Sequence, residues 1–500
     1  MQGSGPLREG SIPSWWQRTT LAEERKRLVA EAARPDQFVE SENDRTRLAE
    51  DETVRLGALI LAEAFTPASI QRLYGAIDSW PVNPPAYKND LKRKIANWRS
   101  SSGYGAWQSV TTFTKPGNRF IGSAVKDSNV PDPIEAVHLF AMMASPSVTL
   151  IVAVFIPHDS DGDFSPILSK DFPNEVRNVR IRLPGPMGTV RAKNPWSRAK
   201  NPYYSMHVAY PSILKREAVD TKIAYLEAHC WEWMSGMGVG RFGSIPLDDR
   251  PSMRLFVTEG IEPFGDRRHA LQAVDLDYST QLWSYESRND YYFALGDSYG
   301  PQERRVAVIA ATRDNLNSVT GADRSAGQAS ILGLVDAFSR NHTELIGVWA
   351  LAQLLDRYRH EISSIRDSIT QDRSSIRTAR RLNEFLWTDG NDTTIIAKDV
   401  ARLTAKDSYF GHRIDPLIDV NQLQHSSDAE VPPKYLRQEL REQLNKSASD
   451  LVDESDAAIR SISSSSQLLQ SISDTNLQRM ILAFTICAVV IALVALFVSG

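Results

Sequence analysis

The chain has 500 residues, of which 42% are hydrophobic and 24% are charged, and its formal net charge is −4. This composition excludes a disordered chain, and the length predicts more than one structural unit. Because the net charge is small, we exclude a protein whose whole surface is built for nucleic acid. The two cysteines, Cys230 and Cys487, are too few for a disulfide framework.

Residues 1–99 are predicted to form an N-terminal helical region. Residues 14–33 are rich in good helix formers, and the proline at position 35 is a typical helix stop. Residues 51–78 carry apolar side chains at helical spacing, so we expect a second helix there. The chain begins without an apolar stretch behind a basic start, so the sequence predicts no secretory signal peptide.

Residues 100–327 are predicted to form an α/β (or α+β) domain with a mixed central sheet. The segments expected to be strands are rich in β-branched and aromatic residues and cover 148–156, 206–210, 254–257, 291–295 and 305–311. The first and the last of them are apolar enough to be buried on both faces of the sheet. Residues 213–234 are expected to form a helix.

Residues 328–387 are predicted to be helical, and no strand is expected after about position 328. Apolar side chains alternate at spacings of four and three from Leu351 to Ile369, and an average spacing of 3.5 is the period of a coiled coil. The alternative is a plain amphipathic helix that packs on a globular core.

Residues 388–433 are predicted to be a connector with one short helix, and residues 434–479 a stalk helix. An apolar stripe on the stalk needs a partner, which can be the preceding helical segment, another copy of the chain, or both. Residues 461–473 carry no charge, and seven of the thirteen are serine. They can form either a close-packed neck or a flexible hinge.

Residues 480–498 are predicted to be a transmembrane helix. Nineteen uncharged, mostly apolar residues form a helix of roughly 28 Å, close to the thickness of a bilayer core. The alternative is a buried helix of a soluble domain. Because Arg479 precedes the run and no basic residue follows it, we expect a single-pass, tail-anchored protein with residues 1–479 in the cytoplasm.

The segment Asp474-Thr475-Asn476-Leu477-Gln478-Arg479 leads directly into this apolar run. With the order of parts, an α/β domain followed by two helical stretches, it resembles the CorA-type divalent-cation transporters over residues 340–498. The resemblance implies a homo-oligomer with a helical stalk below a cytoplasmic domain. The Gly-Met-Asn motif and the second membrane helix of that family are absent from this sequence, so no ion-selecting residue is carried over.

Residues 176–216 contain no acidic residue and many basic ones, and a tandem repeat within them reads RAKNPW at 191–196 and RAKNPY at 198–203. Cationic groups beside aromatic rings suit anionic headgroups and phosphates. The candidate residues for an anion- or lipid-binding site are Arg177, Arg180, Arg182, Arg191, Lys193, Trp196, Arg198 and Lys200. The alternative is a solvated loop without a ligand.

Two further motifs have spacings that occur in ligand sites. Asp159, Asp161 and Asp163 alternate after a predicted strand, but the glycine and glutamate of a calcium loop are missing, so the choice is between a simpler divalent-cation site and a polar turn. No other cofactor is indicated. Residues 238–243 (GVGRFG) have the spacing of a dinucleotide fingerprint but follow a helix instead of a strand, which is the wrong context for that motif.

The function favoured by these patterns is that of a non-enzymatic, membrane-anchored oligomer whose cytoplasmic domain binds a ligand or a partner. One alternative is a divergent CorA-like channel for a divalent cation such as magnesium. Another is a membrane-tethered enzyme whose site the sequence does not reveal. The expected partners are the membrane, a second copy of the chain, and an anionic lipid or phosphate-bearing ligand, whereas nucleic acid is not expected.

Overall fold

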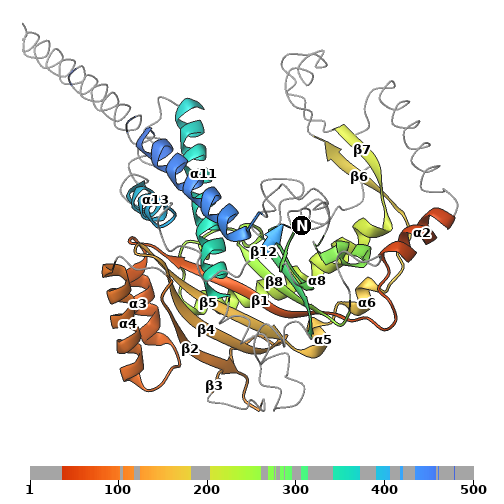
Figure 1. The fold of residues 1–500 in the computed structure, drawn as a ribbon, viewed down its shortest axis with the longest axis horizontal. Coiled ribbons are helices and arrows are strands. Elements are labelled where there is room, and N and C mark those ends of the chain that lie inside the picture. Colours follow the sequence, from red (N-terminus) through yellow and green to blue (C-terminus); the bar gives the residue numbers. More distant parts are fainter. Residues whose placement is uncertain are drawn as a thin grey trace, which may run out of the picture.

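A ten-stranded mixed sheet forms the centre of the described part of the protein (Figure 1). The computed structural model describes residues 36–101, 105–117, 124–181, 203–260, 268–274, 276, 282–285, 288–295, 306–313, 342–371, 390–405, 417–419, 434–457, 460 and 478. The order of the strands across the sheet is β12 (Leu417–Asp419), β9 (Leu282–Tyr285), β10 (Arg288–Leu295), β11 (Val306–Thr312), β8 (Ser252–Thr258), β1 (Val54–Phe65), β5 (Val148–Pro157), β4 (Ile134–Ser145), β2 (Trp107–Thr114) and β3 (Val125–Lys126).

Parallel and antiparallel pairs both occur in the sheet. β8 pairs with β11 in parallel, and β2 with β3, whereas β1, β4 and β5 pair with their neighbours in antiparallel register. The helices that surround the sheet are α2 (Asp36–Thr46), α3 (Ile70–Ser79), α4 (Pro85–Ser100), α5 (Asp159–Gly162), α6 (Ser165–Leu168), α8 (Pro211–Met237), α11 (Thr343–Gln371) and α13 (Asn391–Leu403), with the 3-10 turns η1 (Leu247–Asp249) and η2 (Arg268–Val274).

The five predicted strands are confirmed as β5, β7, β8, β10 and β11, and the helix predicted for residues 213–234 is confirmed as α8. All ten residues of β5 are buried, as a continuous apolar run on a central strand requires. The β7 strand (Tyr203–Ala209) does not join the large sheet, because it pairs only with β6 (Glu175–Ile181) in the described part of the chain.

The prediction of a helix over residues 51–78 is wrong for its first half. β1 is a strand at the middle of the sheet, between β8 and β5, and nearly every position in it is buried. Its apolar residues follow one another almost without interruption, which fits helical spacing but also fits a strand covered on both faces. Helix begins only at Ile70, so the sheet includes residues ahead of position 100, where the sequence places the start of the α/β domain.

The helix α8 covers one face of the sheet. The Trp233 ring packs edge-on against Phe113 of β2 and Phe155 of β5, with ring centroids 5.4 and 5.5 Å apart. At the end of α8, the Trp80 indole N–H donates to the carbonyl of Met237 at 2.8 Å and so joins α8 to the end of α3.

The opposite face is covered by α11. Gly347 of α11 approaches Met142 of β4 so closely that a Cβ at this glycine would lie 2.8 Å from the methionine sulfur. Met142 pairs with Leu150 of β5. Since side chains alternate along a strand, Leu150 and Phe155 point to opposite faces, so α8 and α11 lie on opposite sides of the sheet.

Residues of α11 with coiled-coil spacing are part of this core. Leu351, Leu355, Tyr358 and Ile362 are all buried in the same hydrophobic cluster as the sheet. Residues 343–362 therefore have the second of the two expected packings, that of an amphipathic helix on a globular core. Residues 372–387 are outside the described ranges.

Residues 436–457 are helical, as predicted for the first part of the stalk. The apolar stripe Leu436, Leu440, Leu444 and Leu451 is buried in the same core. The Asn445 amide donates to the carbonyl of Ala401 at 3.2 Å and to the Thr404 hydroxyl at 3.0 Å, which joins this helix to the end of α13. This part of the apolar stripe therefore packs against other residues of the same chain.

The connector predicted at 388–433 contains the expected short helix, α13, but β12 corrects the expectation that strands end near 328. A strand of three residues at the sheet edge is too short to give a sequence pattern. The neck at 461–473 and the span at 480–498 fall outside the described residues. Among the helices that are described, none is long and apolar enough to cross a membrane.

Candidate functional site at the base of a two-stranded arm

The strands β6 and β7 form an arm that is separate from the large sheet (Figure 1). They pair in antiparallel register from Glu175 opposite Ala209 to Ile181 opposite Tyr203. The segment 182–202 therefore leaves and re-enters the arm at the Ile181–Tyr203 end. Of the candidate binding residues, the structure places Arg177 and Arg180 in β6. The others, Arg182, Arg191, Lys193, Trp196, Arg198 and Lys200, belong to the connecting segment, which is not among the described residues.

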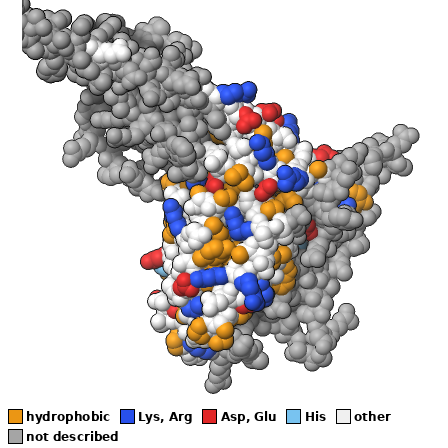
Figure 2. Space-filling view, turned by 90° about the vertical axis from the view of Figure 1, so that its left-hand side faces the viewer, with side chains coloured by type: hydrophobic (Ala, Val, Ile, Leu, Met, Phe, Trp, Pro, Cys, Tyr) orange, Lys and Arg blue, Asp and Glu red, His pale blue; other side chains and the backbone are white. Residues whose placement is uncertain are grey.

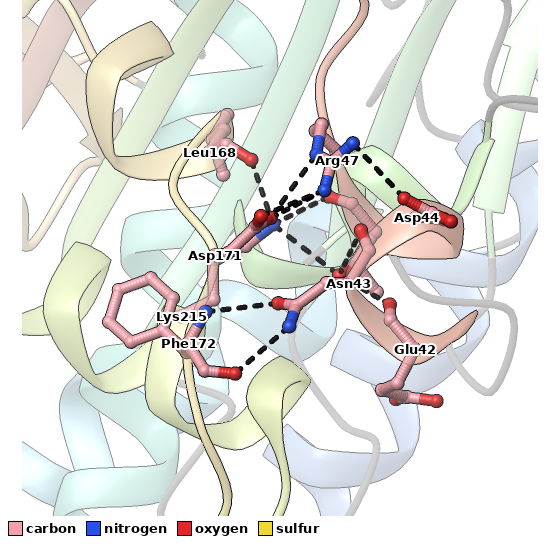
Figure 3. Close-up of polar contacts among 9 residues, drawn as sticks. Glu42, Asn43, Asp44, Arg47, Leu168, Asp171, Phe172 and Lys215 are labelled. Atoms are coloured by element: carbon pink, nitrogen blue, oxygen red, sulfur yellow. Dashed lines mark hydrogen bonds and ion pairs between the residues drawn. The ribbon is translucent and has the colours of Figure 1, made fainter. Parts of the chain in front are cut away.

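The other end of the arm is tied to α2 by a pair of reciprocal hydrogen bonds (Figure 3). The Asn43 side chain is 4% exposed. Its Nδ2 donates to the carbonyl of Phe172 at 3.0 Å, and the Phe172 N–H donates to its Oδ1 at 3.0 Å. One buried amide side chain thus satisfies both backbone groups of a residue just ahead of β6, which fixes where the arm begins.

An ion pair lies beside this amide. Arg47 donates from Nε to Asp171 Oδ1 at 3.1 Å and from Nη2 to both carboxylate oxygens at 2.8 Å. The hydrogen bond to Asp171 raises the pKa of the Arg47 guanidinium above its ordinary value. Both side chains are exposed, so this pair adds orientation more than stability.

Lys215 of α8 is the buried member of the cluster and has no exposed surface. Its Nζ donates to the carbonyl of Thr46 at 2.9 Å, to the carbonyl of Leu168 at 2.8 Å and to the Thr46 hydroxyl at 3.4 Å (Figure 3). Thr46 and Leu168 are the last residues of α2 and α6, where carbonyls have no partner within their own helix. The ammonium therefore joins the ends of two helices to the first turns of α8.

Burial lowers the pKa of Lys215 to about 8, although the nearby Asp171 charge opposes this shift. The amine remains mostly protonated at neutral pH, and its N–H groups are directed at carbonyl oxygens. A lysine in this setting is a structural cation and does not offer a free nucleophile.

The base of the arm comprises α2, residues 168–172 and the start of α8, and an aromatic contact closes it. The rings of Phe38 and Tyr210 meet edge-on with centroids 5.7 Å apart. The basic composition of residues 176–216 predicts an anion-binding segment, but it does not predict which residues form the base of the arm. Asn43, Arg47 and Asp171 are distant in sequence, and a buried lysine is rare. The available signal for Lys215 is its place within the buried stripe of α8, beside Leu214 and Val219.

The three predicted metal ligands have separate partners. Asp159 forms an ion pair with Arg55, Asp161 accepts from the Ser160 hydroxyl at 3.3 Å, and Asp163 accepts from the Ser165 N–H at 2.9 Å. Within the described ranges, no group of three or more His, Cys, Asp or Glu side chains could hold a metal ion. The structure therefore does not bring these three carboxylates together as one set of metal ligands.

The thiol of Cys230 is buried in the hydrophobic core. Burial raises the pKa of Cys230 well above its ordinary value, and the Glu227 charge adds to this effect. Glu227 is itself engaged, since it accepts from Arg254 at 3.0 Å and from the Ser252 hydroxyl at 2.6 Å. A protonated, buried thiol is not a nucleophile, so the role of Cys230 in this structure is core packing.

A second basic surface lies on α3 and α4, away from the arm. Residues 67–101 contain six basic residues and two acidic ones. The acids Asp78 and Asp90 pair with Lys92, Arg93 and Lys94, which leaves a surplus of positive charge. Figure 2 views this side of the molecule and shows Lys and Arg side chains among hydrophobic ones. This surface offers a comparison for tests of the arm.

Comparison with known proteins adds no relative. No protein-family model matches the chain, and no curated protein matches it. A functional assignment therefore depends on the residues of this chain, and above all on the arm and its base.

Proposed function

We propose that this chain is a non-enzymatic, membrane-anchored protein whose β6–β7 arm binds an anionic ligand, with the headgroups of anionic lipids as the ligand that suits its membrane setting. The observation that carries the proposal is the position of the acid-free, basic and aromatic segment. It is attached to the Ile181–Tyr203 end of a two-stranded arm whose opposite end is held by buried polar contacts.

The charge of the arm supports an anionic partner. Residues 176–202 carry seven Lys and Arg residues and no Asp or Glu. Near an anionic membrane surface each such residue contributes about 1 kcal/mol of binding free energy, and salt weakens the effect. Trp196 and Tyr203 add aromatic rings suited to the interfacial region.

The base gives the arm a defined starting direction. Because Asn43 and Lys215 fix the backbone on both sides of the strands, the arm loses less conformational entropy on binding than a free loop would. Binding at the arm would reach α8 directly, since β7 ends at Ala209 and α8 begins at Pro211.

The membrane part of the proposal places residues 480–498 in a bilayer and residues 1–479 in the cytoplasm. Its support is the length of the uncharged run and the single arginine ahead of it. Since the apolar stripe at 436–451 packs within the chain, self-association is assigned to residues 458–479. Alkaline carbonate extraction should leave the full chain in the membrane pellet and release a chain ending at Gln478.

Vesicle sedimentation tests the ligand. The chain ending at Gln478 retains every residue that the structure describes, so it can be mixed with vesicles of phosphatidylcholine alone or with added phosphatidylserine. We expect binding only to the anionic vesicles. The variant Lys193→Glu/Lys200→Glu, with one reversal in each repeat, should weaken this binding by about tenfold or more.

A matched control separates the arm from general basic charge. Arg72→Glu/Arg93→Glu changes the net charge by the same amount at two exposed arginines of α3 and α4. We expect it to weaken vesicle binding by less than about twofold, because the interaction is short-ranged. Equal losses in the two variants would contradict a binding role for the arm.

A further inference from the structure

The base of the arm carries exposed apolar side chains. Among the described residues six large apolar side chains are exposed, and two of them, Phe38 and Ile213, belong to this base. Phe38 packs edge-on against the ring of Tyr210, and the Ile213 N–H donates to the Tyr210 carbonyl at 3.0 Å. The three residues therefore lie together where α2 meets the first turn of α8 (Figure 1). We call Phe38, Tyr210 and Ile213 the apolar patch.

Buried polar contacts hold the elements that carry the apolar patch. Lys215, two residues after Ile213, donates to the last carbonyls of α2 and α6. Asn43 of α2 binds both backbone groups of Phe172, just ahead of the arm. Because these contacts fix α2 and the start of α8, the apolar patch needs little ordering when a partner binds to it.

The charges beside the apolar patch are balanced. Glu42 and Arg45 follow Phe38 by four and seven positions, on the same side of α2, and they pair at 3.0 Å. On α8 the positions three and four after Ile213 hold one arginine and one glutamate. The patch itself is therefore neutral, and attraction to a charged partner has to come from the arm.

Other acids of α2 lie on different sides of the helix. Since successive residues are about 100° apart around a helix, Glu40 and Asp44 are turned about 160° and about 120° away from Phe38. Asp44 also pairs with Arg47 at 3.0 Å. The side of α2 that carries Phe38 is therefore free of net charge.

The apolar patch and the basic segment are attached to opposite ends of the same arm. β7 ends at Ala209, immediately before Tyr210, whereas residues 182–202 join the strands at the Ile181–Tyr203 end. Each strand has seven residues and spans roughly 23 Å. An arm that lies along a bilayer would therefore bring cationic groups to the headgroups at one end and apolar side chains to the interface at the other.

We propose that the apolar patch inserts into the interfacial region of an anionic bilayer while the arm binds the headgroups. This inference rests on the lipid binding proposed for the arm and adds a second contact to it. A bilayer fits the patch because residues 176–202, with seven cationic side chains and no acidic one, direct the neighbouring arm to an anionic surface. Apolar side chains beside cationic ones are the combination by which peripheral segments bind anionic lipids.

The two contacts respond differently to salt. Attraction between the cationic arm and the headgroups weakens as the ionic strength rises, because ions screen it. Burial of Phe38 and Ile213 in the interface depends on the apolar area removed from water, which is not screened. Loss of the patch should therefore weaken binding by the same factor at any ionic strength, whereas loss of arm charge should matter less at high salt.

Vesicle sedimentation of the chain ending at Gln478 measures these factors. In Phe38→Gln/Ile213→Gln we expect binding to vesicles that contain phosphatidylserine to fall about tenfold. This factor should be the same at ionic strengths of about 0.1 M and about 0.3 M. The loss caused by Lys193→Glu/Lys200→Glu should be smaller at the higher of the two.

The matched control is Tyr225→Gln/Ile395→Gln. Ile395 on α13 is 43% exposed, against 42% for Ile213, and Tyr225 on a later turn of α8 is 52% exposed, against 40% for Phe38. The control thus makes the same change at comparably exposed apolar positions outside the patch. We expect it to bind vesicles as the unaltered chain does. Equal losses in the two variants would overturn the insertion of the patch.

Photolabelling of the full chain tests the apolar patch without any variant. The chain is placed in vesicles whose lipids carry a diazirine on an acyl chain, and labelled peptides are identified by mass spectrometry. We expect label on residues 36–46 and 211–216 when phosphatidylserine is present, and none on residues 391–403 of α13.

The outcomes separate the apolar patch from the arm. If the base stays unlabelled while Lys193→Glu/Lys200→Glu still weakens vesicle binding, the patch is overturned and the function of the arm stands. A patch variant that binds vesicles normally but dissociates an oligomer would assign the patch to a second copy and overturn its insertion. No binding of the unaltered chain to anionic vesicles would contradict the arm and the patch together.

Discussion

The two ends of α8 hold buried charges of opposite sign, and the backbone accommodates both. At the first turns, Lys215 donates to carbonyls that end α2 and α6. Past the last turn, Glu63 accepts from N–H groups of the loop 238–243. The comparison shows that backbone groups without a partner in regular structure can host a charge in a core, where a side-chain counter-ion would otherwise be required.

The buried groups at the two ends of α8 differ in how their protonation changes near neutral pH. Lys215, whose pKa is about 8, stays mostly charged at neutral pH and joins fixed elements. Glu63, whose pKa is about 7, changes its charge near neutral pH. We therefore expect the charge of Lys215 to be constant at neutral pH and the contribution of Glu63 to the stability to depend on pH near 7.

The largest effect is expected for Lys215→Met. This variant keeps the volume of the side chain but leaves the buried carbonyl of Thr46 without its Lys215 donor and the carbonyl of Leu168 with only the Leu48 N–H at 3.3 Å. We expect the free energy of unfolding to fall by about 4 kcal/mol, measured by chemical denaturation. Lys446→Met, at an exposed position of the helix 436–457, should change it by less than about 0.5 kcal/mol. A loss of similar size in both variants would remove the anchor role.

The next effect concerns the close approach of the loop to Glu63. In Gly240→Ala the new methyl group would lie 2.4 Å from the Ala64 carbonyl oxygen. The backbone must shift, and we expect the unfolding free energy to fall by about 3 kcal/mol. Gly236→Ala is the matched substitution, because it places its methyl group in open space on α8. It should be neutral or stabilising by up to about 1 kcal/mol. A neutral Gly240→Ala would show that the loop is not held against β1.

The pH dependence of stability separates the two ends. Glu63 has a raised pKa, so its contribution is fully present below 4.5 and is lost as the pH rises through about 7. Lys215 has a lowered pKa, so its contribution to stability increases as the pH rises from about 8 toward 10.5.

Denaturation midpoints of the unaltered chain and of each variant at pH 5, 8 and 10 measure these slopes. From pH 5 to pH 8 we expect a fall of about 2.5 kcal/mol that is absent from Glu63→Gln. Lys215→Met should retain that fall and lose the rise above pH 8. If both slopes survive in both variants, other groups are responsible for them.

Much of the sheet could be predicted from the sequence because its strands are continuous apolar runs. Residues 148–156 and 306–311 are almost wholly apolar, and both lie in strands inside the sheet, β5 and β11. β1 was missed because its apolar residues satisfy the helical period as well as a strand buried on both faces. Local pattern cannot decide between the two, since the decision comes from the strands on either side.

The sequence predicts the basic composition of the candidate site but not the contacts that form the base of the arm. The absence of acidic residues from 176 to 216 points to the anion-binding segment without any structure. The base required Asn43 to meet Phe172 across 129 positions and Lys215 to meet Thr46 across 169. In the same way, Glu63 and the loop 238–243 carry no sequence sign of each other, because their contact depends on how α8 returns to β1.

Lysine footprinting of the full chain in vesicles tests the central claim most directly. Acetylation read by mass spectrometry should show Lys193 and Lys200 protected in vesicles that contain phosphatidylserine, compared with phosphatidylcholine alone. Lys398 and Lys446, which are exposed on other helices, should react equally in both. Lys193 and Lys200 that react to the same extent in both kinds of vesicle would contradict an anionic-lipid role for the arm.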